Sequence, residues 1–181
     1  MRKEKIVKKF KMDGETIIFR YPTIKDLNGL LNHINSLIEE RAKISLQKKK
    51  SKKEEKEWLL ESLKNIKEKS EVFLVVDWEE KIMGSCRANK KDGSRAHVAE
   101  FGISLNKEIR GKGIGTLLLK TLIKETEKVF KIKIAVLDVF SSNTIAQGLY
   151  KKLGFKEVGR IKKGVNYYGK YQDWIIMAKY L

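Results

Sequence analysis

Residues 103–116 read Ile103-Ser-Leu-Asn-Lys-Glu-Ile-Arg110-Gly111-Lys112-Gly113-Ile114-Gly115-Thr116. Apolar residues recur at helical spacing after the glycines, so the segment predicts a strand, a tight turn and the start of a helix. Alternating glycines there leave the backbone N–H groups of the first helical turn uncovered and let an anion approach closely. The segment predicts a phosphate cradle, and a purely structural strand-to-helix turn is the alternative.

Two common phosphate-binding motifs are excluded. The chain has no run of Gly, four residues and Gly-Lys-Ser/Thr, so it contains no P-loop. The dinucleotide fingerprint Gly-x-Gly-x-x-Gly also fails, because Thr116 stands three residues after Gly113.

A second informative segment lies one predicted helix and one predicted strand further on. It reads Asn143-Thr-Ile-Ala146-Gln-Gly-Leu-Tyr150-Lys-Lys-Leu-Gly154-Phe155. Residues 144–153 predict a short helix, because Gly154 supplies the residue that tolerates positive φ past its end. Asn143 and Tyr150 are seven residues apart and therefore share one helix face.

Together, the two segments resemble the GNAT superfamily of acetyl-CoA-dependent N-acetyltransferases. Arg110-x-x-Gly113-x-Gly115 looks like that family's Arg/Gln-x-x-Gly-x-Gly/Ala signature, and residues 143–155 resemble its later Asn, Ala, Tyr and Gly-Phe segment. The order of predicted elements is similar to the family's from about residue 16 to residue 181. The resemblance implies acetyl-CoA as co-substrate, no metal, and acetyl transfer to a primary amine by direct attack.

The resemblance also implies which residues bind acetyl-CoA. The backbone of residues 103–105 would run beside the pantetheine arm, and residues 110–116 would bind the pyrophosphate, with Lys112 as a charge partner. Asn143 would either bond the pantetheine arm or cap its helix. The implied cofactor-binding residues are Ile103, Ser104, Leu105, Arg110, Gly111, Lys112, Gly113, Ile114, Gly115, Thr116, Asn143 and Tyr150.

Two residues are candidates for proton transfer. The family resemblance makes Tyr150 the general acid that protonates the departing thiolate, and simple packing is the alternative. Glu100, on the strand that enters the site, is the candidate base, directly or through a water, with His97 as the alternative base. Tyr167 and Tyr168 would contact the acceptor or merely cover apolar surface.

The rest of the chain predicts an α/β fold of the α+β type. Periodicity and turn residues predict a mixed, mostly antiparallel twisted sheet of about seven strands, flanked by about four helices. The predicted strands cover residues 15–22, 72–77, 81–88, 97–105, 132–140, 155–161 and 171–180, and the helices cover 23–40, 51–70, 114–129 and 144–153. Residues 1–181 are expected to form a single N-acetyltransferase domain, with residues 1–14 as an N-terminal extension.

The amino-acid composition indicates where the protein is located more than it indicates what the protein does. The 181 residues carry a formal charge of +17, which attracts polyanions but selects no single function. The lone Cys86, with only His33 and His97, makes a disulfide framework or a metal site unexpected. No stretch approaches the roughly 20 apolar residues of a membrane span, and no signal peptide is recognisable, so a cytoplasmic protein is expected.

The expected activity is transfer of an acetyl group to either a protein N-terminus or a small amine. The alternative is a noncatalytic acyl-CoA-binding or RNA- or ribosome-associated module that uses the basic surface. The expected partners are therefore acetyl-CoA and an amine acceptor, without a membrane. Nucleic acid, the ribosome and a second copy of the chain, as in a homodimer, are further candidates.

Overall fold

The computed structural model describes residues 5–181, through which one eight-stranded sheet runs in the order β1-β2-β3-β4-β5-β6-β8-β7. The strands are β1 (Ile6–Met12), β2 (Glu15–Arg20), β3 (Glu71–Trp78), β4 (Lys81–Lys90), β5 (Val98–Leu105), β6 (Ile134–Phe140), β7 (Lys156–Tyr167) and β8 (Lys170–Tyr180). The helices are α1 (Leu27–Glu39), α2 (Lys52–Lys67), α3 (Ile114–Phe130) and α4 (Thr144–Lys152). Neighbouring strands are antiparallel, apart from β5 and β6, which are parallel.

This architecture confirms the predicted fold class and corrects one part of it. The sheet has eight strands rather than about seven, because Ile6–Met12 pairs with β2 as an edge strand. The interpretation of residues 1–14 as an extension is therefore wrong for this segment, and residues 1–4 lie outside the described part. Lysines on the solvent side of an edge strand discourage further pairing, and here they give the strand the composition of a charged tail.

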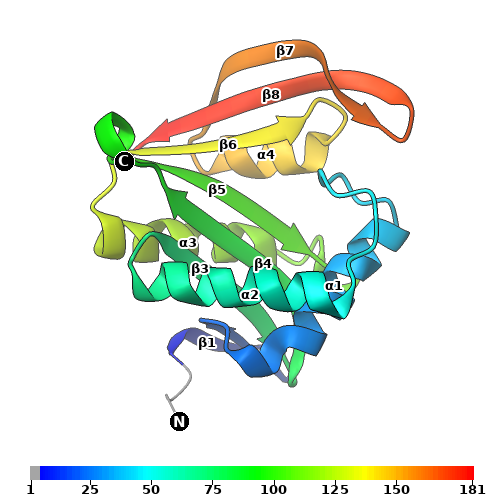
Figure 1. Cartoon of the computed structure of the whole chain (residues 1–181), viewed down its shortest axis with the longest axis vertical. Helices are drawn as coiled ribbons and strands as arrows, with labels where there is room; N and C mark the ends of the chain where they lie inside the picture. Colours follow the sequence, from blue (N-terminus) through cyan, green and yellow to red (C-terminus); the bar gives the residue numbers. More distant parts are fainter. Residues whose placement is uncertain (1–4) are drawn as a thin grey trace.

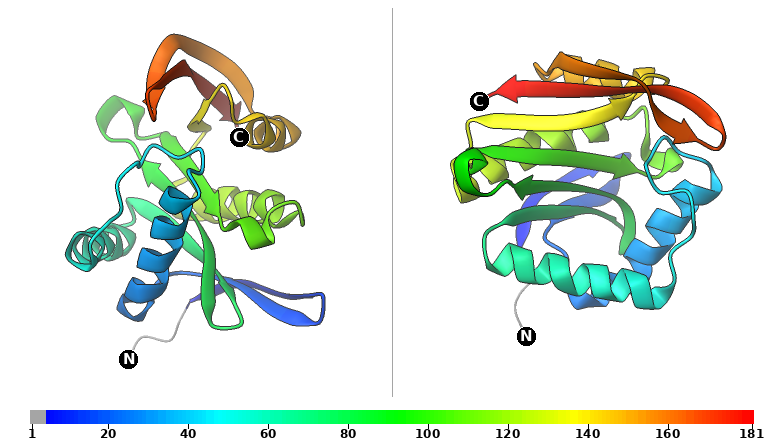
Figure 2. Two further views of the ribbon diagram at one scale, coloured as in Figure 1. Left: turned by 90° about the vertical axis from the view of Figure 1, so that its right-hand side faces the viewer. Right: turned by 45° about the horizontal axis from the view of Figure 1, so that its top comes forward.

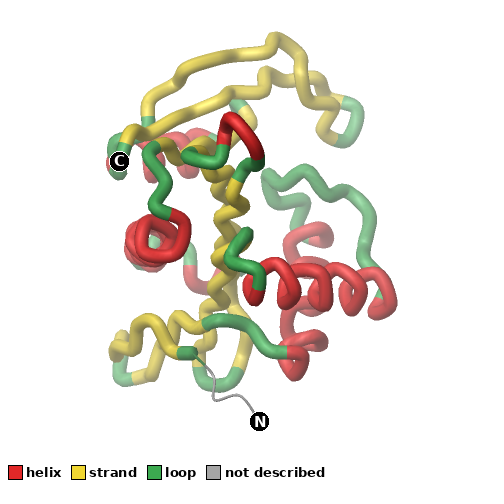
Figure 3. Tube along the Cα trace, turned by 60° about the vertical axis from the view of Figure 1, so that its left-hand side comes forward, coloured by secondary structure: helices red, strands yellow, loops and turns green. Residues whose placement is uncertain are grey.

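The helices cover both faces of the sheet (Figures 1 and 2). Viewed nearly along the sheet, α3 lies on one side while α1 and α2 lie on the other (Figure 3). A large apolar core fills the α3 side, and a smaller one joins α1 and α2 to β3 and β4. No helix among residues 5–181 is long and apolar enough to cross a membrane.

The capping residues that the sequence predicts are present before both early helices. Thr23 and Asp26 form a capping box around the 3₁₀ turn Ile24–Asp26, which leads into α1, and Ser51 and Glu54 form another at the start of α2. Asp26 also receives two hydrogen bonds from the buried guanidinium of Arg20, at 2.7 and 2.9 Å. Arg20 Nε donates to Asp77 on β3 at 2.8 Å, so this cluster fastens the start of α1 to the sheet.

The last two strands form a longer hairpin than predicted. They cover residues 156–167 and 170–180, against expected ranges of 155–161 and 171–180. Register shifts on either side of Ile161 interrupt the pairing, and the hairpin arches over the rest of the sheet (Figure 1). Its tip lies beside the connection between α1 and α2 (Figure 2).

Candidate active site

A cleft opens where β5 and β6 part. Their parallel pairing runs only from Val98 and Ile134 to Glu100 and Val136, although both strands continue beyond these residues. The cleft has a volume of about 710 Å³. Seven of the predicted site residues line it, namely Glu100, Ile103, Ser104, Leu105, Arg110, Asn143 and Tyr150. The parting of the strands therefore brings two distant sequence segments to one site.

The start of α3 has the features of an anion site. Its N-cap, Gly113, has φ +79° and supplies no capping side chain. The first helical hydrogen bond runs from Leu117 N to Gly113 O at 3.1 Å, so the N–H groups of residues 114–116 have no partner within the helix. A Cβ added at Gly111 or Gly113 would meet no atom within 4 Å, which shows that their backbone is openly accessible.

The third glycine of the motif serves close packing. A Cβ added at Gly115 would lie 2.9 Å from Leu149 Cδ1 and 3.3 Å from Leu105 Cδ1. Both leucines line the cleft, so the missing side chain lets the first turn of α3 approach the cleft wall. Gly111, Gly113, Ile114, Gly115 and Thr116 do not themselves line the cleft.

The two basic residues of the motif point in different directions. Arg110 lines the cleft, donates from Nε to Leu105 O at 2.8 Å and pairs with Glu40 at the end of α1. Lys112 lies 3.7 Å from Asp13 and above the ring of Trp78, outside the cleft. The structure therefore does not bring the Lys112 ammonium to the other predicted residues.

Asn143 and Tyr150 share the cleft-facing side of α4, as their spacing predicts. Asn143 Oδ1 accepts from Ala146 N at 3.3 Å, so the helix-capping role is present. Tyr150 is only 6% exposed, and its ring packs beside Phe155. Burial and the nearby charge of Asp138 raise the pKa of Tyr150 well above its usual value. Its hydroxyl therefore carries a proton at neutral pH and has no hydrogen-bond partner among residues 5–181.

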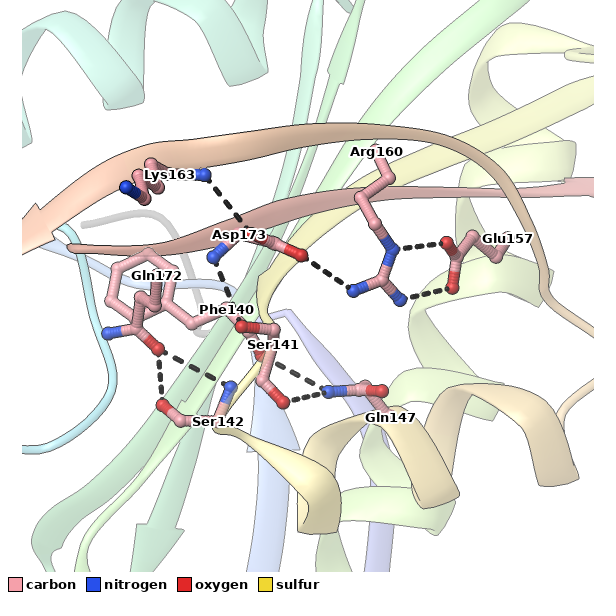
Figure 4. Close-up of polar contacts among 9 residues, drawn as sticks. All are labelled: Phe140, Ser141, Ser142, Gln147, Glu157, Arg160, Lys163, Gln172 and Asp173. Carbon is pink, nitrogen blue, oxygen red and sulfur yellow. Dashed lines mark hydrogen bonds and ion pairs between the residues drawn. The ribbon is translucent and has the colours of Figure 1, made fainter.

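The connection from β6 to α4 is firmly held (Figure 4). Gln147 Nε2 donates to Ser141 O at 2.9 Å, and Asp173 N donates to Ser141 Oγ at 3.1 Å. Ser142 N donates to Gln172 Oε1 at 3.3 Å. These bonds tie the start of α4 to β8 and so position Asn143 and Tyr150.

The two candidate bases differ in position. Glu100 lines the cleft at the point where β5 and β6 part, with a side chain that is 46% exposed and paired with Lys91. His97 precedes β5 at the opposite end of the strand and does not line the cleft. Among residues 5–181, no group of three or more His, Cys, Asp and Glu side chains is placed to hold a metal ion.

His33 on α1 is a site residue that the motifs did not indicate. It is 3% exposed, and its Nε2 lies 2.9 Å from Ser104 Oγ in the cleft wall. Its Nδ1 lies 2.5 Å from Asn106 Oδ1, and Ser104 Oγ is 3.2 Å from Ser85 Oγ. The available sequence signal was a histidine on the apolar stripe of α1, three residues after Leu30.

A second cavity of about 380 Å³ lies between α1, α2 and the sheet. It shares its wall with the cleft at six residues, namely Ile44, Ser45, Arg87, Gly102, Ile103 and Ser104. Glu55 lines this cavity, is 5% exposed and has no hydrogen bond or ion pair from its carboxylate to residues 5–181. Burial raises the pKa of Glu55, and the charge of Lys50 opposes that shift.

The connection between α1 and α2 forms a strap, residues 40–51, that borders both spaces. The Tyr167 hydroxyl at the hairpin tip donates to Ala42 O at 2.8 Å, and Gln47 Nε2 donates to Asn166 O at 2.8 Å. Arg41 lies over the ring of Tyr168. Both tyrosines therefore hold the strap, a role that the sequence did not predict.

The fold and cleft define a class of protein: a mixed-sheet α/β protein whose central parallel strands part beside a glycine-rich helix start. The model of the Acetyltransferase (GNAT) family matches residues 35–155, which is more than half of the chain. The chain therefore belongs to the GNAT acetyltransferase family, as its two motifs predict.

Individual relatives agree with this assignment. The chain is 33% identical over 85 residues to an L-amino acid N-acetyltransferase of Escherichia coli, covering 47% of this chain and 52% of the relative. It is 38% identical over 84 residues to an N-alpha-acetyltransferase of Sulfurisphaera tokodaii, covering 46% and 47%. The chain thus spans about half the length of these curated relatives.

Solved structures share the fold along most of the chain. A ribosomal-protein-alanine N-acetyltransferase from Brucella melitensis has a TM-score of 0.79 at 24% identity, covering 90% of this chain and 99% of that one. A Salmonella typhimurium protein solved with its cofactor acetyl-CoA has a TM-score of 0.80 at 18% identity, covering 91% and 94%. At these identities the likeness concerns the fold.

Proposed function

We propose that this protein transfers the acetyl group of acetyl-CoA to a primary amine. The observation that carries the proposal is the cleft itself, which has the uncapped start of α3 beside it and the protonated Tyr150 hydroxyl in its wall. Family membership and the names of the relatives, both N-acetyltransferases, support the same activity.

The residues around the cleft fit acetyl-CoA. The free N–H groups of residues 114–116 and the open backbone at Gly111 and Gly113 would bind the pyrophosphate. The backbone of residues 103–105, at the unpaired edge of β5, would lie beside the pantetheine arm. Acetyl-CoA supplies an activated acetyl group as a thioester. Arg110 would act chiefly by holding the end of β5 to α1, because its guanidinium already bonds Leu105 and Glu40.

Tyr150 is proposed as the general acid. Its phenol lines the cleft and keeps its proton at neutral pH, so it can donate that proton to the sulfur as the C–S bond breaks. Glu100 is proposed as a base that receives the amine proton directly or through a water. Its position where the strands part supports this role, and its carboxylate is already paired with Lys91.

The acceptor is proposed to enter through the second cavity. This cavity reaches the cleft at Gly102 and Ser104, on the opposite face of β5 from Ile103 and Leu105. Lys50 lies 3.7 Å from Glu54, and Arg87 lies 3.1 Å from Glu71, whereas Glu55 has no such partner among residues 5–181. A buried carboxylate favours a cationic group, so the acceptor is a small amine or a protein N-terminus that arrives as an ammonium.

The test is an acetyl-CoA transfer screen monitored by thiol release. The acceptors are free amino acids, 1-aminobutane, 1,4-diaminobutane and short peptides with free N-termini. Thiol release that depends on one of these amines supports the proposal, and failure to bind acetyl-CoA overturns it. RNA binding that weakens steeply with salt, without turnover of any amine, would instead favour a noncatalytic RNA- or ribosome-associated module.

We also propose that residues 1–181 form a single N-acetyltransferase domain, because one sheet connects the elements of the described part. Association into a homodimer stays a prediction, which sedimentation of the purified protein at several concentrations would test.

A further inference from the structure

The hydrogen bonds of His33 determine which of its ring nitrogens carries the proton. Asn106 Oδ1 faces Nδ1 at 2.5 Å, and Asn106 Nδ2 faces the sulfur of Met83 at 4.0 Å. The reverse amide orientation would set its oxygen against the sulfur, which is itself a weak acceptor. The carboxamide oxygen only accepts, so Nδ1 must carry a proton, and in a neutral ring Nδ1 is then the only N–H nitrogen.

The other ring nitrogen is then an acceptor aimed at the cleft. Nε2 has a free lone pair and lies 2.9 Å from Ser104 Oγ, so the serine hydroxyl donates its proton to His33. The Ser104 oxygen keeps its own lone pairs for a donor. Ser85 Oγ, at 3.2 Å, occupies one of the two lone pairs. The other lone pair remains for a donor, and Ser104 borders both the cleft and the second cavity.

The groups around His33 favour a neutral ring that can accept a proton transiently. Burial and the charge of Arg110 lower the pKa of His33, whereas Asn106 and Glu40 raise it. Lys50, Glu55 and Arg87 face the same cavity from the strap, α2 and β4. His33 is therefore unprotonated at neutral pH, and Asn106 Oδ1 would stabilise the ring once it becomes charged.

We propose that Ser104 and His33 form a proton relay for the attacking amine, with His33 acting as a positioning residue through Ser104. This relay rests on the proposed acetyl transfer. The acceptor ammonium first gives one proton to Glu100, directly or through a water, which frees the nitrogen lone pair. As the C–N bond forms, the amine nitrogen gives a second proton to Ser104 Oγ, and Ser104 gives its own proton to His33 Nε2. The C–S bond breaks, and the sulfur takes a proton from Tyr150. Glu100 and His33 then return their protons to solvent and Tyr150 regains one, so protons and electrons balance.

The relay explains why a histidine stands in the apolar stripe of α1. Glu100 is partly exposed and paired with Lys91, whereas His33 Nε2 is an acceptor already bonded to a hydroxyl in the wall shared by both spaces. A merely structural His33 would have the same tautomer, because Asn106 Oδ1 requires a proton on Nδ1 in either role. The tautomer therefore tests whether Nε2 can accept a proton, and the pH dependence of kcat separates the two roles.

The first experiment needs no acceptor. Long-range ¹H–¹⁵N spectra of the ¹⁵N-labelled protein report the tautomer of each histidine, and there are only two histidines, His33 and His97. His97→Gln and His33→Gln assign the signals. We expect His33 to be neutral with its proton on Nδ1 at pH 7 and to remain so at pH 6.5. A proton on Nε2, or an imidazolium at pH 7, would overturn the relay.

The second experiment measures kcat against pH with the best amine of the screen at saturation. Wild-type kcat should fall in acid as His33 becomes protonated. In both His33→Gln and Ser104→Ala, kcat should drop by about 10²-fold and lose that inflection. Ser85→Ala should keep the inflection, because the bond from Ser104 to His33 remains.

Two kinetic outcomes contradict the relay. One is an unchanged acid limb in His33→Gln and Ser104→Ala, with melting temperatures near that of the wild type. If His33→Gln fails to fold, Ser104→Ala alone decides, because it leaves α1 intact. The other is a wild-type chain that binds acetyl-CoA but acetylates none of the amines. That result contradicts the proposed function, and the relay with it, even where the spectra show the expected tautomer.

Discussion

The two sides of β5 are built in different ways. On one side, Ile103 and Leu105 pack against the core beside α3, and the adjoining anion site is made of glycines and backbone N–H groups. On the other side, Ser104 meets His33, and the cavity beyond it is made of side chains from α1, α2, the strap and β4. We call these the cofactor half and the acceptor half.

Under the binding roles proposed above, this difference would let one fold keep its cofactor and change its acceptor. Backbone N–H groups offer the same donors whatever side chains surround them, so the cofactor half depends on a few glycines. The acceptor half depends on which side chains four separate segments bring together. Substitutions in each half should therefore have separable effects.

Asp26→Asn should give the largest loss of stability, and it should leave the cofactor half unaffected. It leaves the buried Arg20 short of one partner, so we expect a loss of about 3 kcal/mol in the free energy of unfolding by urea at pH 7. The affinity for coenzyme A should change little, because α3 is not touched. Asp92→Asn, at an exposed turn, is the matched control.

The loss of stability in Asp26→Asn should depend on pH. Burial alone would raise the pKa of Asp26, but the hydrogen bonds from Arg20 and Thr23 outweigh it and lower the pKa. Because the pKa is lower in the folded state, the ionised carboxylate stabilises the protein above the ordinary pKa of about 3.9. This stabilisation is lost as the pH falls through the folded-state pKa. The unfolding free energies of wild type and variant should converge in acid, and a constant difference would contradict this account.

Tyr150→Phe tests the point where the two halves meet. Loss of the phenolic proton should lower kcat by about 10²-fold, while coenzyme A binding by calorimetry stays nearly unchanged. Tyr180→Phe is the matched control, because Tyr180 is 78% exposed and lies outside the cleft. An unchanged kcat with chemistry rate-limiting would remove Tyr150 from the mechanism.

Gly115→Val tests the cofactor half. The new side chain would push against Leu149 and Leu105, which should cost about 2 kcal/mol of stability and weaken acetyl-CoA binding about tenfold. Gly148→Val is its control on α4, because an added Cβ there meets nothing within 4 Å. Equal effects at the two glycines would show that close packing at α3 is not what the motif protects.

Glu55→Gln should give the smallest effect, and only for the acceptor. Removing the carboxylate charge should raise the KM of the amine by about five- to tenfold and leave the KM of acetyl-CoA unchanged. Glu57→Gln is the matched control, because Glu57 is exposed on the same helix and lines neither the cleft nor the second cavity. An equal rise in both variants would point to a loosened α2 rather than to recognition.

The two halves also differ in how far the sequence predicts them. Glycines at a helix start and an asparagine cap report backbone geometry locally, so residues 103–116 and 143–155 predict the fold and much of the cleft. The ammonium of Lys112 lies outside the cleft, because adjacency in a motif does not determine where a long side chain turns.

No local sequence pattern predicts the acceptor half. His33 and Glu55 look like ordinary residues of amphipathic helices, and their meeting with the sheet depends on how α1 and α2 pack. The edge strand β1 was missed for a related reason, because its three lysines and the register shift after Ile6 mask the alternation. The extra length of β7 was hidden by the register shifts around Ile161.

The short pairing between β5 and β6 has a mechanical consequence. Three residue pairs join a five-stranded half of the sheet to a three-stranded half, and beyond them two strand edges face each other inside the molecule. Exposed edges usually invite another strand, and an extended guest can meet the same backbone groups that a strand would. We therefore expect an extended substrate bound there to pair with these two strand edges and to stiffen the hinge between the halves.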